Sequence, residues 1–129
     1  MQCVVTAVTS PVGQRLAGAL LSAGYQVLGT ADAGGYAEHA NNMAPLLQHP
    51  FFQYHELDLC SRTAVMSLFA GLRVDIVVHL GGRSGLCFLD KNNQHCVDAS
   101  QRMMLNLLDA ALGAQCRHFV YCQAIALYS

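Results

Sequence analysis

The segment 2–16 joins an apolar strand to a helix through a very short turn, and it constrains the fold more than any other part of the chain. Residues 2–7 are apolar and rich in β-branched side chains, which is typical of a strand buried on both faces. Ser10 and Pro11 are the residue types that begin helices, serine as the N-cap and proline as the first helical residue. A strand that passes directly into a helix favours a parallel sheet whose strands are connected by helices.

Strand-like and helix-like segments alternate along the rest of the chain. The further expected strands are 25–30, 52–57, 74–80 and 118–122. The expected helices are 11–23, 41–48, 61–72 and 93–112. Gly24 and Gly113 are expected to end the first and the last of these helices. The alternation predicts a Rossmann-like, doubly wound α/β domain over 1–129, with about five parallel strands in the order 3-2-1-4-5 and helices on both faces.

Composition excludes several classes of function. Hydrophobic residues make up 53% of the 129 residues and charged residues 12%, which favours one domain with a buried sheet. The formal net charge is −1 and the sequence has no basic stripe, so nucleic acid is not an expected partner. No apolar run approaches the roughly 20 residues that span a bilayer, and no membrane contact is expected. The first residues lack the basic region of a signal peptide, which predicts a cytoplasmic protein.

Cysteine and histidine spacing gives no support for a metal site. None of the six cysteines forms a Cys-x-x-Cys pair, and none of the six histidines forms a His-x-x-x-His pair. The cysteines are therefore expected to be reduced, mostly core residues of a cytoplasmic protein.

The first turn has the spacing of a dinucleotide-binding fingerprint but keeps only part of its chemistry. Such a turn uses one glycine for the tight turn, a second for close approach to the pyrophosphate and a third for helix packing. Ala7, Ser10 and Gly13 occupy these three places. Only the packing glycine is present, so the sequence keeps the architecture of a nucleotide site and loses part of its function.

Several motifs in order carry a family resemblance. They are VTAVTSPVGQRL (5–16), VLGTA (27–31), FQYHELDL (52–59), DIVVHLGGRSGL (75–86), and LNLLDA with HFVY (105–110 and 118–121). Together they resemble the extended short-chain dehydrogenase/reductase family of NAD-dependent epimerases and dehydratases. The nearest likeness is to nucleotide-sugar epimerases of the UDP-glucuronate 4-epimerase type. The resemblance covers nearly the whole chain, but only the amino-terminal half of that family.

The resemblance implies NAD as cofactor, with a dinucleotide or a nucleotide sugar as ligand. It places the pyrophosphate at Ala7, Ser10, Pro11, Val12 and Gly13. Ser10 adds a side chain where close approach is needed, and Pro11 removes a backbone N–H that would face the phosphates. Weak NAD binding is expected, and a plain capped helix with an empty site is the alternative.

The resemblance also implies positions for the rest of the cofactor. The acid that binds the adenosine ribose falls on Ala31, so Asp32 either replaces it or is only a turn residue. Asp58 and Leu59 are expected beside the adenine, although Asp58 could instead cap the next helix. The remaining implied positions are Gly81 and Gly82, which replace two alanines of the family, and Ser100, which replaces an asparagine.

The catalytic positions of the family are missing from this chain. The family's Ser/Thr falls on Ala124, and a neighbouring hydroxyl position falls on Ala126. The single lysine, Lys91, follows Cys87 at the spacing where a Tyr-x-x-x-Lys pair would need tyrosine. We therefore expect no catalytic residue and weak or no turnover by this chain alone. The alternatives are a fragment or subunit completed by another chain, and a protein-interaction domain with an empty cofactor cleft.

The helix expected at 93–112 carries apolar residues on more than one face, so a surplus apolar surface needs a partner. In the resembling family this helix pairs with its copy. A homodimer is therefore expected, with Met103 and Leu107 near its centre if their stripe faces outward. The strand 118–122 is expected to form an open sheet edge unless the apolar tail folds back over it.

Overall fold

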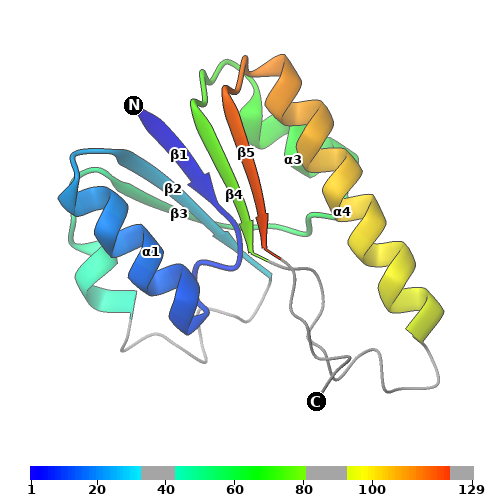
Figure 1. Cartoon of the computed structure of the whole chain (residues 1–129), viewed down its shortest axis with the longest axis horizontal. Helices are drawn as coiled ribbons and strands as arrows, with labels where there is room; N and C mark the ends of the chain where they lie inside the picture. The colour runs from blue at the N-terminus through cyan, green and yellow to red at the C-terminus, as the bar shows by residue number, and fades with distance from the viewer. Residues whose placement is uncertain (33–42, 81–92, 123–129) are drawn as a thin grey trace.

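The computed structural model describes residues 1–32, 43–80 and 93–122, with side chains of the last range from residue 98. The sheet has five parallel strands in the order β3-β2-β1-β4-β5, which confirms the predicted topology (Figure 1). The strands are β1 (Gln2–Val5), β2 (Gln26–Ala31), β3 (Phe52–Glu56), β4 (Ile76–Leu80) and β5 (His118–Cys122).

Helices cover both faces of the sheet. They are α1 (Pro11–Ser22), α3 (Arg62–Phe69) and α4 (Asn93–Gly113), and residues 43–47 are also helical. Figure 1 shows α1 on one side of the sheet, with α3 and α4 on the other. The helix expected at 41–48 thus exists over its described part, whereas residues 41 and 42 lie outside the described residues.

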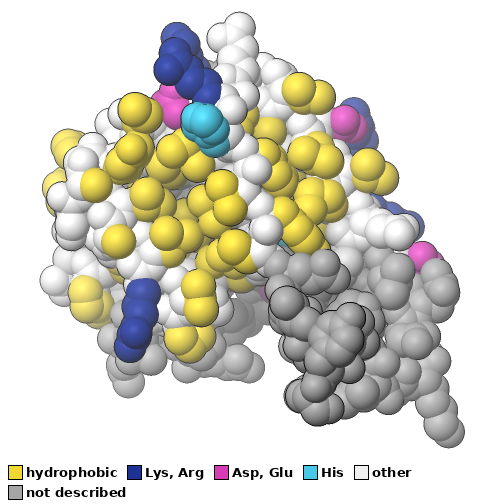
Figure 2. All heavy atoms as spheres, in the orientation of Figure 1, with side chains coloured by type: hydrophobic (Ala, Val, Ile, Leu, Met, Phe, Trp, Pro, Cys, Tyr) yellow, Lys and Arg dark blue, Asp and Glu magenta, His cyan; other side chains and the backbone are white. Residues whose placement is uncertain are grey.

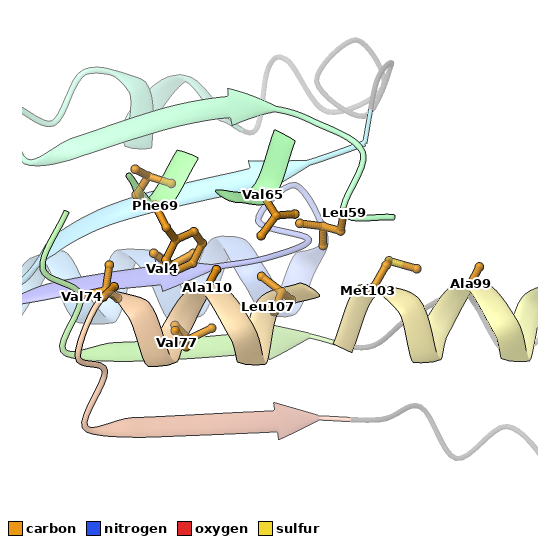
Figure 3. Packing of buried hydrophobic residues seen from close by; sticks show 13 residues of the cluster. Val4, Leu59, Val65, Phe69, Val74, Val77, Ala99, Met103, Leu107 and Ala110 are labelled. Atoms are coloured by element: carbon orange, nitrogen blue, oxygen red, sulfur yellow. The ribbon is translucent and has the colours of Figure 1, made fainter. Parts of the chain in front are cut away.

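Two hydrophobic cores hold these layers together. The larger core lies under α3 and α4, where Val4 of β1 and Val77 of β4 meet Val65, Phe69 and Leu107 of the helices (Figure 3). The smaller core lies under α1 and includes Val5, Val8, Ala17, Leu21, Val27, Met43 and Phe52. Alternate strand residues therefore enter alternate cores, as expected for strands buried on both faces.

The long helix turns its expected dimer residues toward the sheet. Met103 and Leu107 are buried in the larger core (Figure 3), so the condition for placing them at a dimer centre is not met. The outward apolar residues of α4 are Leu105, Leu108 and Leu112, which are 61%, 37% and 78% exposed. A helix on a sheet buries one stripe, and the sequence alone did not indicate which stripe packs on it.

The first helix ends as the sequence predicts. Gly24 has φ +92°, and the N–H of Tyr25 donates to the carbonyl of Leu20 at 3.0 Å. The N–H of Gly24 donates to the carbonyl of Leu21 at 3.0 Å. These two bonds form a Schellman motif, in which glycine tolerates the left-handed conformation.

The last helix ends two residues later than its glycine predicts. Gly113 is helical, and the left-handed residue is Gln115 with φ +59°. The N–H of Cys116 donates to Ala111 at 3.0 Å and that of Gln115 to Leu112 at 3.2 Å, which is the same motif. The expected stop at Gly113 is wrong because Ala114 is buried and extends the packed stripe of the helix past the glycine.

We predict that Gly113→Ala and Gln115→Gly both stabilise the fold. A Cβ at Gly113 meets nothing within 4 Å, and alanine in a helix is favoured over glycine by about 0.5–1 kcal/mol. Glycine at 115 removes left-handed strain of about 1–2 kcal/mol, partly offset by chain entropy. Urea unfolding should show both midpoints rise. A lower urea midpoint for Gly113→Ala would contradict this prediction and would indicate that the helix ends at Gly113.

Candidate nucleotide-binding turn

The turn between β1 and α1 lies at the carboxyl edge of the sheet, between β2 and β4. The N–H of Thr6 donates to Val78 of β4 and that of Val8 to Thr30 of β2, both at 3.0 Å. The turn thus lies where the strand order changes direction, with β2 on one side of β1 and β4 on the other. Doubly wound sheets bind ligands at such a point. Ala7 has φ +50°, the left-handed conformation that a glycine adopts without strain.

Gly13 is required by the contact between helix and turn. A Cβ on Gly13 would lie 2.3 Å from the carbonyl oxygen of Ala7 and 2.8 Å from the Cα of Val8. Both neighbours are backbone atoms and cannot move aside without changing the turn. The third glycine position of the fingerprint therefore keeps its packing role in this chain.

The backbone donors of the turn are largely used within the turn itself. Ser10 Oγ donates to the carbonyl of Ala7 at 2.7 Å and accepts from the N–H of Gly13 at 3.1 Å. The N–H of Ser10 donates to Ala7 at 3.1 Å, and the N–H of Gln14 donates to Ser10 at 2.8 Å. Because Pro11 has no N–H, Val12 supplies the one first-turn N–H for which the described structure shows no hydrogen bond.

Val8 fills space beside the turn, a feature that the fingerprint comparison missed. Its side chain is fully buried, and both its methyl groups lie 2.8 Å from where a Cβ on Gly29 would be. The ring of Phe52 lies 3.0 Å from the same point. Gly29 of β2 could have indicated this contact from the sequence, because a glycine inside a strand often marks a place where another group approaches closely.

The end of β2 carries no acid in the expected ribose position. Ala31 is buried, and its carbonyl accepts from the N–H of Leu57 at 3.0 Å. Asp32 follows with an exposed side chain. Asp32 thus lies at the carboxyl edge of the sheet, and its role in binding ribose stays a prediction.

The loop after β3 is tied down by its own polar groups and by α4. Asp58 is exposed, and its Oδ1 accepts from the N–H of Cys60 at 2.9 Å, just before the N-cap Ser61 of α3. Leu59 is buried in the larger core, and its carbonyl accepts from Asn106 Nδ2 at 2.9 Å. Asn106 is a buried positioning residue on α4 that sequence reasoning missed, because nothing local distinguishes it from a surface asparagine.

The other predicted positions are divided between described and undescribed parts of the chain. Ser100 is partly buried on α4. The predicted positions outside the described residues are Gly81, Gly82, Cys87, Lys91, Ala124 and Ala126.

A buried polar pair lies beside the turn on the face covered by α3 and α4. Thr6 Oγ1 lies 2.7 Å from Nδ1 of His79 and accepts from the N–H of Leu80 at 3.0 Å. Nε2 of His79 is buried and has no hydrogen-bond partner among the described residues, and the ring lies 5.3 Å from that of Tyr121. Burial lowers the pKa of His79 from its ordinary value of 6.5, so the neutral imidazole is favoured.

The described residues contain no group of three His, Cys, Asp or Glu side chains that could hold a metal ion. Their helices include none with the length and apolar character needed to cross a bilayer.

A parallel sheet in this order, with a tight turn leading from β1 into α1, defines a Rossmann-type domain. Residues 3–129 match the family model of the NAD dependent epimerase/dehydratase family, and the chain belongs to that family. The predicted family resemblance is confirmed.

Solved structures share the fold. A UDP-glucuronic acid 4-epimerase from Bacillus cereus, in complex with NAD and a fluorinated UDP-sugar, has a TM-score of 0.76 at 24% identity, over 94% of this chain and 39% of that one. A UDP-glucose 4-epimerase from Bifidobacterium longum, in complex with NAD⁺ and UDP, has a TM-score of 0.77 at 15% identity, over 100% of this chain and 38% of that one.

A curated relative is similar in sequence along the whole chain. An uncharacterised 37.6 kDa protein of Escherichia coli O111:H- is 27% identical over 130 residues, which are 99% of this chain and 39% of the relative. The chain therefore spans about two fifths of the length of the proteins that it matches.

We predict that His79 makes the fold sensitive to acid. Its pKa is lowered in the folded state, so the unfolded chain binds the proton more readily, and the free energy of unfolding decreases as pH falls below 6.5. Chemical unfolding at several pH values should show this loss in the wild type and a smaller loss in His79→Asn. His118→Gln, at an exposed histidine, serves as the control and should follow the wild type. An unchanged pH profile in His79→Asn would contradict the assignment.

Proposed function

We propose that this chain is the NAD-binding part of a nucleotide-sugar epimerase or dehydratase, with a degenerate cofactor turn. It binds NAD weakly and does not turn over nucleotide sugars by itself. The family match and the nucleotide-sugar enzymes among the structural relatives support the class of ligand. The observation that carries the weak binding is the internal use of the turn's hydrogen-bond donors.

The arrangement of Ser10 and Pro11 supports a loss of affinity for a pyrophosphate. Ser10 Oγ accepts a hydrogen bond from the N–H of Gly13, and Pro11 has no N–H to donate. Two backbone donors are therefore unavailable to an anion at the helix N-terminus. A charge-assisted donor contributes roughly 1.5–3 kcal/mol, and each 1.4 kcal/mol is tenfold in affinity. We propose a dissociation constant for NAD of the order of hundreds of micromolar.

Other residues would complete the cofactor site. Asp32 and Asp58 are exposed acids at the carboxyl edge, suited to accept from ribose hydroxyls and the adenine amine. Ser100 on α4 is a further candidate. Leu59 is already packed in the core, so we assign it a supporting position beneath the adenine.

Catalysis requires groups that this chain does not supply. Its sequence has no Tyr-x-x-x-Lys pair, and Ala124 and Ala126 cannot donate hydrogen bonds to a sugar. A second candidate function is a fragment or subunit whose active site is completed by further residues or by another chain. The chain's coverage of about two fifths of its relatives favours this candidate. A cytoplasmic location stays a prediction from the sequence.

We predict that restoring the turn tightens NAD binding. Ser10→Gly with Pro11→Phe returns the N–H of residue 13 and adds one at residue 11, so the dissociation constant should fall about 10–100-fold. Isothermal titration calorimetry with NAD measures it. Ser22→Gly, at the opposite end of α1, makes a similar serine change and should leave the affinity unaltered.

Three outcomes separate the candidates. Low-micromolar binding of NAD by the wild type would contradict a degenerate turn. No binding by either the wild type or the restored variant would favour a pure interaction domain. Turnover of UDP-glucuronate, UDP-galactose or UDP-glucose by the isolated chain would refute the assignment of the catalytic positions.

The outward face of α4 supports a proposed homodimer. Leu105, Leu108 and Leu112 are exposed at a spacing of three and four residues, with Gln101 four residues earlier. This is the spacing of a helix–helix seam, and it lies opposite the buried residues of the same helix. We propose that two copies pair through this leucine stripe rather than through Met103 and Leu107.

We predict that Leu105→Glu with Leu108→Glu removes this pairing, because two charges cannot be buried in the seam. Light scattering should show a smaller assembly for the variant than for the wild type. Leu47→Glu with Phe51→Glu is the matched control, because both residues are exposed and lie outside α4. An identical mass for the α4 variant and the wild type would reject the seam.

A further inference from the structure

The loop between β3 and α3 is held on both sides of Asp58. On one side the N–H of Leu57 donates to the carbonyl of Ala31 in β2 at 3.0 Å. On the other side the carbonyl of Leu59 accepts from Asn106 Nδ2 at 2.9 Å. Asp58 lies between these two anchors, so β2 and α4 together fix the path of the backbone from which its side chain extends.

The turn that follows orients the carboxylate of Asp58. Its Oδ1 accepts from the N–H of Cys60 at 2.9 Å, and its backbone carbonyl accepts from the N–H of Ser61 at 3.0 Å. Its Oδ2 has no hydrogen-bond partner among the described residues, and the side chain is exposed. One carboxylate oxygen therefore holds the turn, and the other is presented at the carboxyl edge of the sheet.

Asn106 makes the principal contact between α4 and this loop. Its side chain is only 5% exposed, and a buried carbonyl that loses its donor is costly. Two other contacts join the same elements and are weaker. The thiol of Cys60 lies 3.6 Å from the carbonyl of Ala99, and thiols are weak donors. Arg62 pairs with Asp109 at 2.6 Å, but these side chains are 61% and 48% exposed, and exposed ion pairs contribute little.

The position of a single carboxylate matters in this molecule because charged side chains are few. The sequence has eight Asp and Glu residues among 129, and Figure 2 shows only a few charged side chains over one face. A hydrogen bond weakens steeply when its donor and acceptor are misaligned. A shift of the loop would therefore weaken any bond that Asp58 makes to a ligand.

We propose that Asn106 is a positioning residue for the selection of adenine. Its hydrogen bond to Leu59 holds Asp58 where Oδ2 accepts from the exocyclic amine of the base. This role rests on the proposed function, in which Asp58 lies beside the adenine of NAD. Hypoxanthine has a carbonyl oxygen in place of that amine, and an ionised carboxylate only accepts hydrogen bonds. The loop therefore selects adenine over hypoxanthine, and Asn106 acts on this selection through Leu59.

The affinities for NAD and for nicotinamide hypoxanthine dinucleotide test this role. Titrations followed by NMR of the amide groups measure both dissociation constants. The wild type should bind NAD roughly tenfold more tightly than the hypoxanthine compound. Asn106→Leu, which has a similar volume and no donor, should reduce this ratio to about twofold or less. Ala110→Gly, at a buried residue one turn further along α4, destabilises the same helix and should keep the wild-type ratio.

Amide hydrogen exchange separates positioning from general damage. In Asn106→Leu the N–H groups of Cys60 and Ser61 should exchange faster, because their bonds to Asp58 depend on the held loop. The N–H of Tyr25, at the end of α1, should exchange as in the wild type. Asn106→Ala, which also lacks the donor, provides the same two measurements if the leucine variant does not fold.

The outcomes distinguish this role from the proposed function. A preference for NAD that the Asn106 variants retain, or unchanged exchange at Cys60 and Ser61, would overturn the positioning role and leave the proposed function intact. Equal binding of the two dinucleotides by the wild type would also overturn it, because the loop would then make no selection. Binding of neither by the wild type would refute the proposed function, and the selection of adenine with it.

Discussion

The contact between Gly13 and the backbone of Ala7 and Val8 is the constraint on which the rest of this structure depends. It sets how closely α1 approaches the end of β1, because a Cβ would lie 2.3 Å from the Ala7 carbonyl oxygen. With α1 in this place, its buried residues reach the strands and form the smaller core. The same approach puts the N-terminus of the helix over the carboxyl edge of the sheet, which is the edge where doubly wound sheets bind ligands. One glycine thus couples the packing of a layer to the position of the site.

Most of the fold was predictable because its signals are local. Apolar strands, serine caps and the Gly24 stop each depend on a few neighbouring residues, and they agree with the alternating pattern that sets the strand order. The stop of α4 was mispredicted because burial of Ala114 outweighs the helix-breaking tendency of Gly113. The sequence left open which stripe of α4 packs on the sheet. Leucines lie on both sides of this helix, and only packing distinguishes them.

The site was less predictable than the fold. Sequence comparison located the turn and its altered positions, but not the network that Ser10 makes with Ala7 and Gly13. Nor could it show that Val8 occupies the space above Gly29, or that Asn106 holds the loop at Leu59. These are contacts between residues distant along the chain or through the backbone, and no local pattern specifies them.

The turn illustrates a conflict between folding and binding. A turn that presents free N–H groups to a phosphate leaves them to water when the phosphate is absent, so these groups add no internal hydrogen bond to the fold. Here Ser10 satisfies the N–H of Gly13, and Pro11 removes a donor while favouring the start of the helix. Both changes stabilise the turn in the absence of a ligand, and under the proposed function they weaken its binding of a pyrophosphate. The hydrogen bonds of Ser10 thus hold the conformation of the turn without a bound ligand.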